Sequence, residues 1–286
     1  MDPLDSPSRL EACIINHDTS PFAELALRSF AQMHGKPPPD LNLSLTIVDN
    51  HSQDDGFADL KDAAADVGVA IVPSRWPARE AHCNTHGDVL RDFVLDHRDA
   101  DMFLFIDADV MFDEPSTVWT MAEELQSAAD LWAVQARDHW IETNIGAGES
   151  LNIWQGRPED LWVAIGEPPD EPIVGRHKRR CHPFCTLVRN SEVFLRVADA
   201  VGLSAAVTIS QNEHVAGFAD TLGMASQVLA THELRYMLSA ALVTHFGGVT
   251  HLSPATETEP KLRECRRLLG GYRQTGREPD SKGPWS

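Results

Sequence analysis

Two aspartates, one residue apart, directly follow an apolar segment and give the strongest chemical signal in the chain. Residues 102–106 are apolar and lead into Asp107 and Asp109. Two carboxylates this close repel each other unless a cation lies between them. A hard divalent cation with open coordination sites can also bind diphosphate oxygens and offset the charge on a departing nucleoside diphosphate. We therefore predict that Asp107 and Asp109 bind a metal, with a solvated turn after a strand as the simpler alternative.

The segments around this pair predict an α/β fold. Short apolar segments alternate with segments of helical periodicity, and we expect strands at residues 11–16, 41–49, 69–72, 102–106 and 131–135. This order predicts a mostly parallel, Rossmann-like sheet with helices on both faces. Ligands of such sheets bind at the carboxyl ends of the strands, which is where Asn16, Asp49 and Asp107 lie.

The second half of the chain is less regular but is expected to complete the same domain. Residues 138–182 carry scattered Trp, Gly and Pro and read as long loops around a site. Further strands are expected at 186–189 and 240–244, and helices at 191–201 and 218–230. We predict one domain over residues 10–252, a C-terminal helix over 253–275 and a disordered tail over 276–286. Asp54 and Asp55 are expected to cap the helix that follows them.

Composition excludes several classes of partner. The net charge of −19 disfavours nucleic acids and membrane surfaces, which are themselves polyanionic. No segment has the roughly 20 apolar residues of a membrane-spanning helix, and residues 1–9 do not resemble a signal peptide. Five scattered cysteines fit free thiols in a cytoplasmic protein. One basic run, residues 176–180, either meets a phosphate-bearing ligand or forms a solvated face.

The ordered motifs resemble those of inverting GT-A glycosyltransferases of the family-2 type, over about residues 10–252. The resemblance is carried by Asn16 at the end of the first strand, by residues 45–55, by Asn84, by the Asp107-Ala108-Asp109 motif, and by residues 183–190, 218–224 and 243–248. It implies the GT-A fold, a single domain and long loops on the acceptor side. Ala219 stands where many relatives have the glutamate of a Glu-Asp pair.

The resemblance also implies a role for each matching residue. Nucleotide-sugar binding is expected from Asn16, Asp49, Asn84 and Asp107. Metal binding is expected from Asp109, Asp107 and His245, with Mn²⁺ or Mg²⁺ as the ion. Asp220 is the expected general base, which takes a proton from the acceptor hydroxyl during a direct, inverting displacement, and Glu213 is the reserve candidate.

These expectations describe a metal-dependent glycosyltransferase that moves one sugar from a nucleotide-diphosphate sugar to a small-molecule or glycan acceptor. UDP is the expected nucleotide, with GDP and dTDP open. The Gln-x-x-Arg-Trp motif of processive polysaccharide synthases is absent, which favours transfer of a single sugar.

Three alternatives remain open. A sugar-nucleotide nucleotidyltransferase would need a glycine-rich, basic loop after the first strand, and residues 16–21 contain no glycine, lysine or arginine. A phosphohydrolase would use Asp107 as nucleophile and Asp109 as acid. Such enzymes have Thr or Val at the fifth position of an Asp-x-Asp-x-Thr/Val motif, and this chain has Met111 there. A non-catalytic protein that binds sugar nucleotides on the same scaffold is the third.

Overall fold

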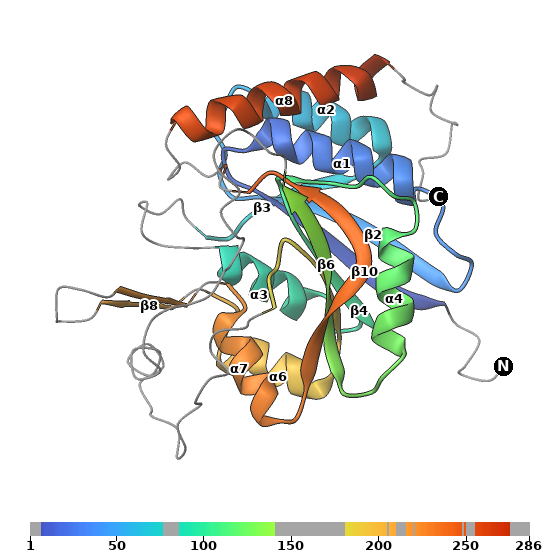
Figure 1. The fold of residues 1–286 in the computed structure, drawn as a ribbon, viewed down its shortest axis with the longest axis vertical. Coiled ribbons are helices and arrows are strands. Elements are labelled where there is room, and N and C mark those ends of the chain that lie inside the picture. Colours follow the sequence, from blue (N-terminus) through green and yellow to red (C-terminus); the bar gives the residue numbers. More distant parts are fainter. Residues whose placement is uncertain are drawn as a thin grey trace.

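The structure is a computed structural model that describes residues 7–76, 86–140, 181–204, 206–209, 216–219, 221–247, 249 and 255–274. Its centre is an eight-stranded sheet of order β3-β2-β1-β4-β7-β6-β10-β5 (Figure 1). The strands are β1 (Ser8–Asn16), β2 (Leu41–Asp49), β3 (Ala70–Pro73), β4 (Met102–Asp107), β5 (Val110–Met111), β6 (Leu131–Trp140), β7 (Cys185–Arg189) and β10 (Arg235–His245). A separate two-stranded sheet pairs β8 (Ala206–Ile209) with β9 (Ala216–Ala219).

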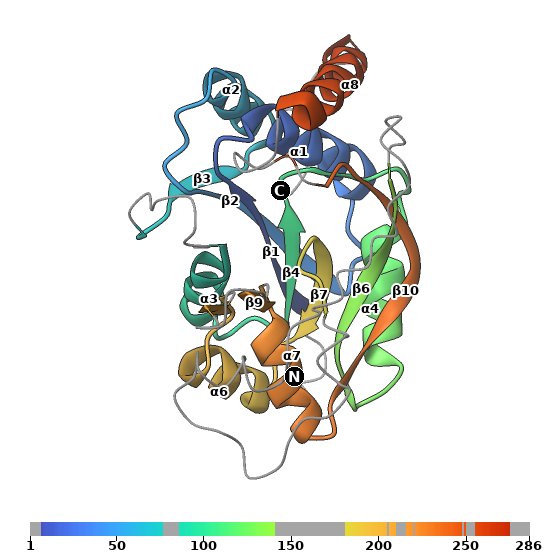
Figure 2. The same cartoon turned by 60° about the vertical axis from the view of Figure 1, so that its left-hand side comes forward.

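Helices cover both faces of the large sheet. The described helices are α1 (Ser20–His34), α2 (Phe57–Val67), α3 (His86–Asp96), α4 (Thr117–Gln126), α6 (Glu192–Ala200), α7 (Gly223–Thr231) and α8 (Ala255–Gln274). Alternate residues of β1 point to opposite faces: Ile14 packs with α1, α2 and α4, whereas Ile15 packs with α3, α6 and α7. The α/β class predicted from the sequence is confirmed, and Figure 2 shows the curled sheet between its helices.

The sheet is mixed, with a parallel half that carries most of the predicted site. Parallel pairing joins β3, β2, β1 and β4, and a second parallel pair joins β6 to β10. The strand β7 lies between β4 and β6 and pairs antiparallel with both. Local periodicity predicted seven of the eight strands of this sheet, all except the two-residue β5. It could not show that β7 inserts between two strands that precede it in the chain.

Three local predictions need correction. Strand β6 continues to Trp140, well beyond residue 135. The predicted helix over 218–230 begins only at Gly223, because β9 ends at Ala219 and Leu222 adopts a left-handed backbone with φ 63°. Asp54 does not cap α2, since its carboxylate receives the backbone N–H and the hydroxyl of Ser20 at the start of α1, at 3.1 and 2.6 Å. No side chain, that of Asp55 included, caps α2.

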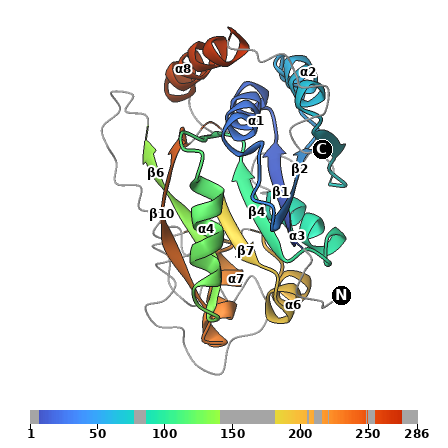
Figure 3. The ribbon, with the colours of Figure 1, turned by 90° about the vertical axis from the view of Figure 1, so that its right-hand side faces the viewer.

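The C-terminal helix α8 packs against α1 on the side away from the sheet (Figure 3). Cys265 and Leu269 of α8 join Phe22 and Leu25 of α1 in a small core that also contains Phe246. Arg273 forms an ion pair with the buried carboxylate of Glu24, which ties the two helices together. None of the described helices is long and apolar enough to cross a membrane.

Candidate functional site

Asp107, Asp109 and His245 converge at the carboxyl end of β4. Each offers one potential ligand atom, and these atoms lie within 4.8 Å of one another. Strand pairing produces this convergence, because β5 starts just after Asp109 and pairs with β10 so that Val110 lies opposite His245. The N–H of Phe246 then donates to the carbonyl of Asp109 at 3.0 Å. The predicted ligands are therefore brought together from two distant parts of the chain.

The electrostatics of the cluster are those of closely packed opposite charges. Burial by itself raises the pKa of Asp107, but the interaction with His86 and the charges of His245 and His182 outweigh burial and lower that pKa. Burial by itself lowers the pKa of His245, but Asp109 and Asp138 outweigh it and raise the pKa to about 10. In this structure the Nε2 atom of His245 is 3.3 Å from Oδ1 of Asp109.

The cluster has the chemistry of a divalent metal site. Carboxylate oxygens and an imidazole suit Mn²⁺, and carboxylates alone suit Mg²⁺. The Oδ1 atom of Asp107 is buried and receives no well-aligned hydrogen bond within the described part of the chain. Among the described residues, this trio is the one group of His, Cys, Asp and Glu side chains with the spacing of a metal site.

Three residues to which the sequence analysis gave no individual role complete the surroundings of the cluster. His86, at the start of α3, places Nε2 3.3 Å from Oδ1 of Asp107. Asp138, in the part of β6 that was not predicted, places Oδ2 3.6 Å from Nδ1 of His245. Phe184 stacks on the ring of His245 and accepts a hydrogen bond at its carbonyl from the N–H of Asp107, at 2.8 Å. No local pattern marks Asp138, because Gln135, Arg137 and Asp138 itself are polar and interrupt the apolar run of β6.

Asn16 and Asp49 lie side by side at the ends of β1 and β2. The side-chain amide of Asn16 donates to Oδ1 of Asp49 at 3.0 Å and to the hydroxyl of Ser52 at 2.9 Å, while Thr19 donates to its carbonyl oxygen at 3.1 Å. The N–H of Ser52 donates to the second carboxylate oxygen of Asp49 at 3.2 Å. Asn16 is completely buried, so in this arrangement it contacts Asp49 and not solvent.

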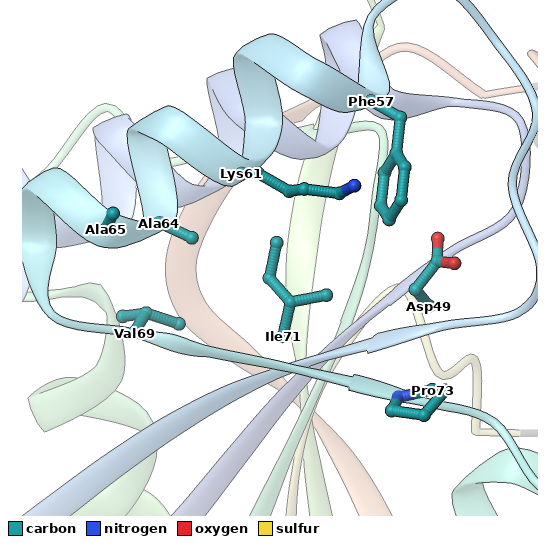
Figure 4. Close-up of a pocket in the computed structure, with 8 residues that line it drawn as sticks. All are labelled: Asp49, Phe57, Lys61, Ala64, Ala65, Val69, Ile71 and Pro73. Atoms are coloured by element: carbon teal, nitrogen blue, oxygen red, sulfur yellow. The ribbon is translucent and has the colours of Figure 1, made fainter.

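A groove opens beside Asp49 between α2 and the edge strand β3 (Figure 4). Its volume is about 470 Å³, and its lining is Asp49, Phe57, Lys61, Ala64, Ala65, Val69, Ile71 and Pro73. The ammonium of Lys61 lies 4.4 Å from the centre of the Phe57 ring. The groove thus combines an aromatic face, a cation and a carboxylate at the carboxyl edge of the sheet.

No family model and no curated protein matches this sequence. Solved structures do match its fold. One is glucosyl-3-phosphoglycerate synthase from Mycobacterium tuberculosis with phosphoglyceric acid (TM-score 0.50, 12% identity, 95% of this chain and 82% of that one). Another is mannosyltransferase PcManGT from Pyrobaculum calidifontis with GDP-Man and Mn²⁺ (TM-score 0.52, 14% identity, with 98% of this chain and 68% of that one covered). The chain has the GT-A fold.

A further GT-A match is the same synthase in complex with Mn²⁺, UDP and phosphoglyceric acid (TM-score 0.50, 14% identity, 93% of this chain and 78% of that one). Structural similarity at such low sequence identity establishes the GT-A fold of this chain, but not its chemistry.

Several predicted site residues lie outside the described residues: Asn84, Asp220, the reserve base Glu213 and the basic run 176–180. The residue after Asp220 is described, and it lies close to the cluster of Asp107, Asp109 and His245. The hydroxyl of Thr221 is 3.4 Å from Nδ1 of His86, whose Nε2 faces Asp107. The assignment of Asp220 as the base stays a prediction.

Proposed function

We propose that this protein is a metal-dependent glycosyltransferase that moves one sugar from a nucleotide-diphosphate sugar to an acceptor hydroxyl, with inversion at the anomeric carbon. The observation that carries the proposal is the convergence of Asp107, Asp109 and His245 at the carboxyl edge of a GT-A sheet. In open α/β sheets this edge is where ligands bind. The resemblance of the motifs to family-2 enzymes supports inversion.

The donor nucleotide is proposed to lie along the edge from Asp49 to the metal cluster. Asp49 would accept a hydrogen bond from an N–H of the base, and Asn16 would hold the Asp49 carboxylate in place through the bond described above. Asn84 is proposed to contact the donor as well. UDP is the favoured nucleotide, and the neighbouring structures contain UDP in one protein and GDP-Man in another.

Asp109, Asp107 and His245 would hold Mn²⁺ or Mg²⁺, and the ion would offset the negative charge that develops on the departing diphosphate. The protein's own contribution is to keep these ligands in place before the donor arrives. The backbone bonds of Asp107 to Phe184 and of Phe246 to Asp109 fix the two carboxylates relative to the sheet. His86 adds a nearby cation when it is protonated.

Asp220 is proposed as the general base. It would take the proton of the acceptor hydroxyl while that oxygen forms a bond to the anomeric carbon and the bond to the diphosphate oxygen breaks on the opposite side. Glu213 is the alternative base. The acceptor is proposed to be a small molecule or a glycan.

Release of nucleoside diphosphate from a panel of sugar nucleotides tests this proposal. UDP-, GDP- and dTDP-sugars would be incubated with the protein, Mn²⁺ and a mixture of candidate acceptors, and the nucleotide products separated by chromatography. We expect release from one nucleotide class, dependent on Mn²⁺ and on acceptor, and reduced about 100-fold or more in Asp220→Asn. A matched Glu213→Gln variant identifies the base, since only the true base shows that loss.

Two outcomes would contradict the proposal. Pyrophosphate formation from a nucleoside triphosphate and a sugar phosphate would favour a nucleotidyltransferase. Trapping of a phosphate on Asp107 would favour a phosphohydrolase.

A further inference from the structure

The imidazole of His245 lies between two carboxylates that come from different parts of the chain. Its Nε2 atom is 3.3 Å from Oδ1 of Asp109, and its Nδ1 atom is 3.6 Å from Oδ2 of Asp138. The side chains of His245 and Asp138 are only 10% and 19% exposed. Asp138 therefore faces the ring nitrogen on the opposite side from the metal cluster.

The sheet itself places Asp138 beside His245. Strands β6 and β10 are parallel, with Val243 opposite Asp138 and His245 opposite Trp140. Because side chains alternate along a strand and paired residues share a face, Asp138 and His245 lie on the same face as diagonal neighbours. Both therefore come from regular strands, which hold side chains more precisely than loops do.

Asp138 is not itself placed as a metal ligand. The ligand atoms that lie within 4.8 Å of one another belong to Asp107, Asp109 and His245, and Asp138 is not among them. Its closest contact with this group is the one with His245, so His245 is the direct route by which Asp138 can act on a metal there.

Stacking on Phe184 does not determine which ring nitrogen of His245 carries the proton. The Phe184 ring stacks on the imidazole with centroids 4.8 Å apart and planes 8° from parallel. Stacking fixes the plane of the imidazole, but it is nearly the same whichever way the ring is turned within that plane. A hydrogen-bond acceptor on one side is needed to decide which nitrogen carries the proton and which offers its lone pair.

We propose that Asp138 is a positioning residue for metal binding. Its carboxylate lies 3.6 Å from Nδ1 of His245 and is placed to accept the Nδ1–H. This would fix the tautomer and the orientation in which Nε2 offers its lone pair to a metal ion beside Asp109. An outer carboxylate on a metal-binding histidine both orients the ring and makes it a stronger ligand. The inference rests on the proposed metal function of Asp107, Asp109 and His245.

Calorimetric titration of the full chain with Mn²⁺, without nucleotide, tests this role. We expect Asp138→Ala to weaken Mn²⁺ binding by about 10- to 100-fold, the usual effect of losing an outer-shell partner. Asp138→Asn keeps an oxygen that can accept the Nδ1–H, so it should restore most of the affinity that Asp138→Ala loses. This rescue would assign the effect to an acceptor for the Nδ1–H and not to the negative charge of Asp138. A loss of Mn²⁺ affinity in Asp138→Ala with an unchanged melting temperature in EDTA would separate it from a merely structural role.

Asp130→Asn is the matched control. The carboxylate of Asp130, just before β6, forms an ion pair with Arg235 at the start of β10, at 2.6 Å. This pair lies at the opposite end of the two strands from Asp138 and His245. Substitution of Asp130 should leave Mn²⁺ affinity unchanged. Melting temperatures measured in EDTA show whether each variant is folded, and Asp138→Asn decides the question if Asp138→Ala does not fold.

The outcomes separate the inference from the function on which it rests. If the parent protein binds Mn²⁺ and a folded Asp138→Ala binds it equally well, the positioning role is wrong while the metal site stands. If Asp138→Asn loses as much Mn²⁺ affinity as Asp138→Ala, then Asp138 does not act as the acceptor for the Nδ1–H, and control of the His245 tautomer is wrong. If the parent protein binds no Mn²⁺, the metal site and the inference fail together.

Discussion

Phe184 stacks on His245 with ring centroids 4.8 Å apart and planes 8° from parallel. Phe184 precedes β7, the strand that inserts between β4 and β6, and its carbonyl accepts the N–H of Asp107 at 2.8 Å. One residue therefore contacts two proposed metal ligands, one through its ring and one through its backbone. The position of β7 in the sheet makes both contacts possible.

Replacing Phe184 by Leu should reduce Mn²⁺ affinity by about tenfold, because it removes the flat surface that holds the His245 ring while keeping an apolar side chain. Phe194→Leu is the control, since Phe194 is also a buried aromatic, stacked on Trp132 on the other face of the sheet. Calorimetric titration with Mn²⁺ compares the two variants. Equal Mn²⁺ affinity in both would mean that the stacking does not contribute to the site.

Gly87→Ala should destabilise the protein, because α3 packs too closely on the segment before the small hairpin to admit a methyl group. A Cβ at Gly87 would lie 2.3 Å from the carbonyl oxygen of Leu203 and 2.3 Å from the Cα of Ser204, which are both backbone atoms. We expect a loss of about 3 kcal/mol in the free energy of unfolding, measured with urea. The shift of α3 should also displace His86 and weaken Mn²⁺ binding.

Gly270→Ala is the control for this substitution. Gly270 is also helical, but a Cβ there would meet no atom within 4 Å. Alanine should therefore leave stability unchanged or raise it by up to about 1 kcal/mol, the usual helix preference for alanine over glycine. Destabilisation by Gly270→Ala as large as that by Gly87→Ala would refute the packing explanation.

Asn16→Ala should lower the free energy of unfolding by about 3 kcal/mol, because it leaves buried hydrogen-bonding groups of Asp49, Ser52 and Thr19 without their partner. Urea unfolding measures this loss. The same variant should also lose stabilisation by nucleotide, since Asp49 is no longer held. Asn42→Ala, at an exposed position of β2, is the control and should change neither property. A fully stable Asn16→Ala variant would show that the network contributes little to the fold.

His34 should make the fold sensitive to acid. Its ring is completely buried against Phe30, Phe112 and Trp119, and Nε2 accepts the N–H of Val118 in the first turn of α4, at 3.4 Å. Burial disfavours the charged imidazolium and lowers the pKa of His34 to about 4, from an ordinary value of 6.5. The folded state therefore binds this proton less readily than the unfolded state does.

The sign of the effect follows from that difference in pKa. The contribution of neutral His34 is fully present above pH 6.5 and is lost progressively as the pH falls toward 4, up to about 3 kcal/mol. Urea unfolding at pH 7 and pH 4.5 should show a smaller pH-dependent loss in His34→Gln than in the parent. His232→Gln, at an exposed position after α7, should behave like the parent. The same loss in parent and His34→Gln would exclude His34 as the cause.

The sequence predicted the parts of the site that lie at the ends of apolar strands. Asp107 was accessible because β4 is buried on both faces and is a continuous apolar run whose end is easily seen. Asp49 was accessible because β2, which alternates at first, becomes apolar just before it. His245 was found through the resemblance of its motif. Asp138 was missed because the polar residues Gln135, Arg137 and Asp138 interrupt the apolar pattern of β6, although the strand continues to Trp140.

Contacts between distant segments could not be predicted from local patterns. The placement of β7 between β4 and β6 depends on pairing that no periodicity encodes. The same is true of Asp54, whose partner Ser20 lies in a different helix from the one that Asp54 precedes. His86 likewise acquires its role only when α3 packs beside the end of β4.

Thermal unfolding with nucleotides tests the central claim most directly. The parent protein and Asp109→Asn would be melted with UDP, GDP or dTDP, each in Mn²⁺ and in EDTA, with Asp130→Asn as the control. A nucleotide at about 100 times its dissociation constant adds about 2.7 kcal/mol, which raises the melting temperature by several degrees. We predict such a rise for one nucleotide, only with Mn²⁺, in the parent and Asp130→Asn but not in Asp109→Asn. No rise with any nucleotide in Mn²⁺, or an undiminished rise in Asp109→Asn, would contradict the account.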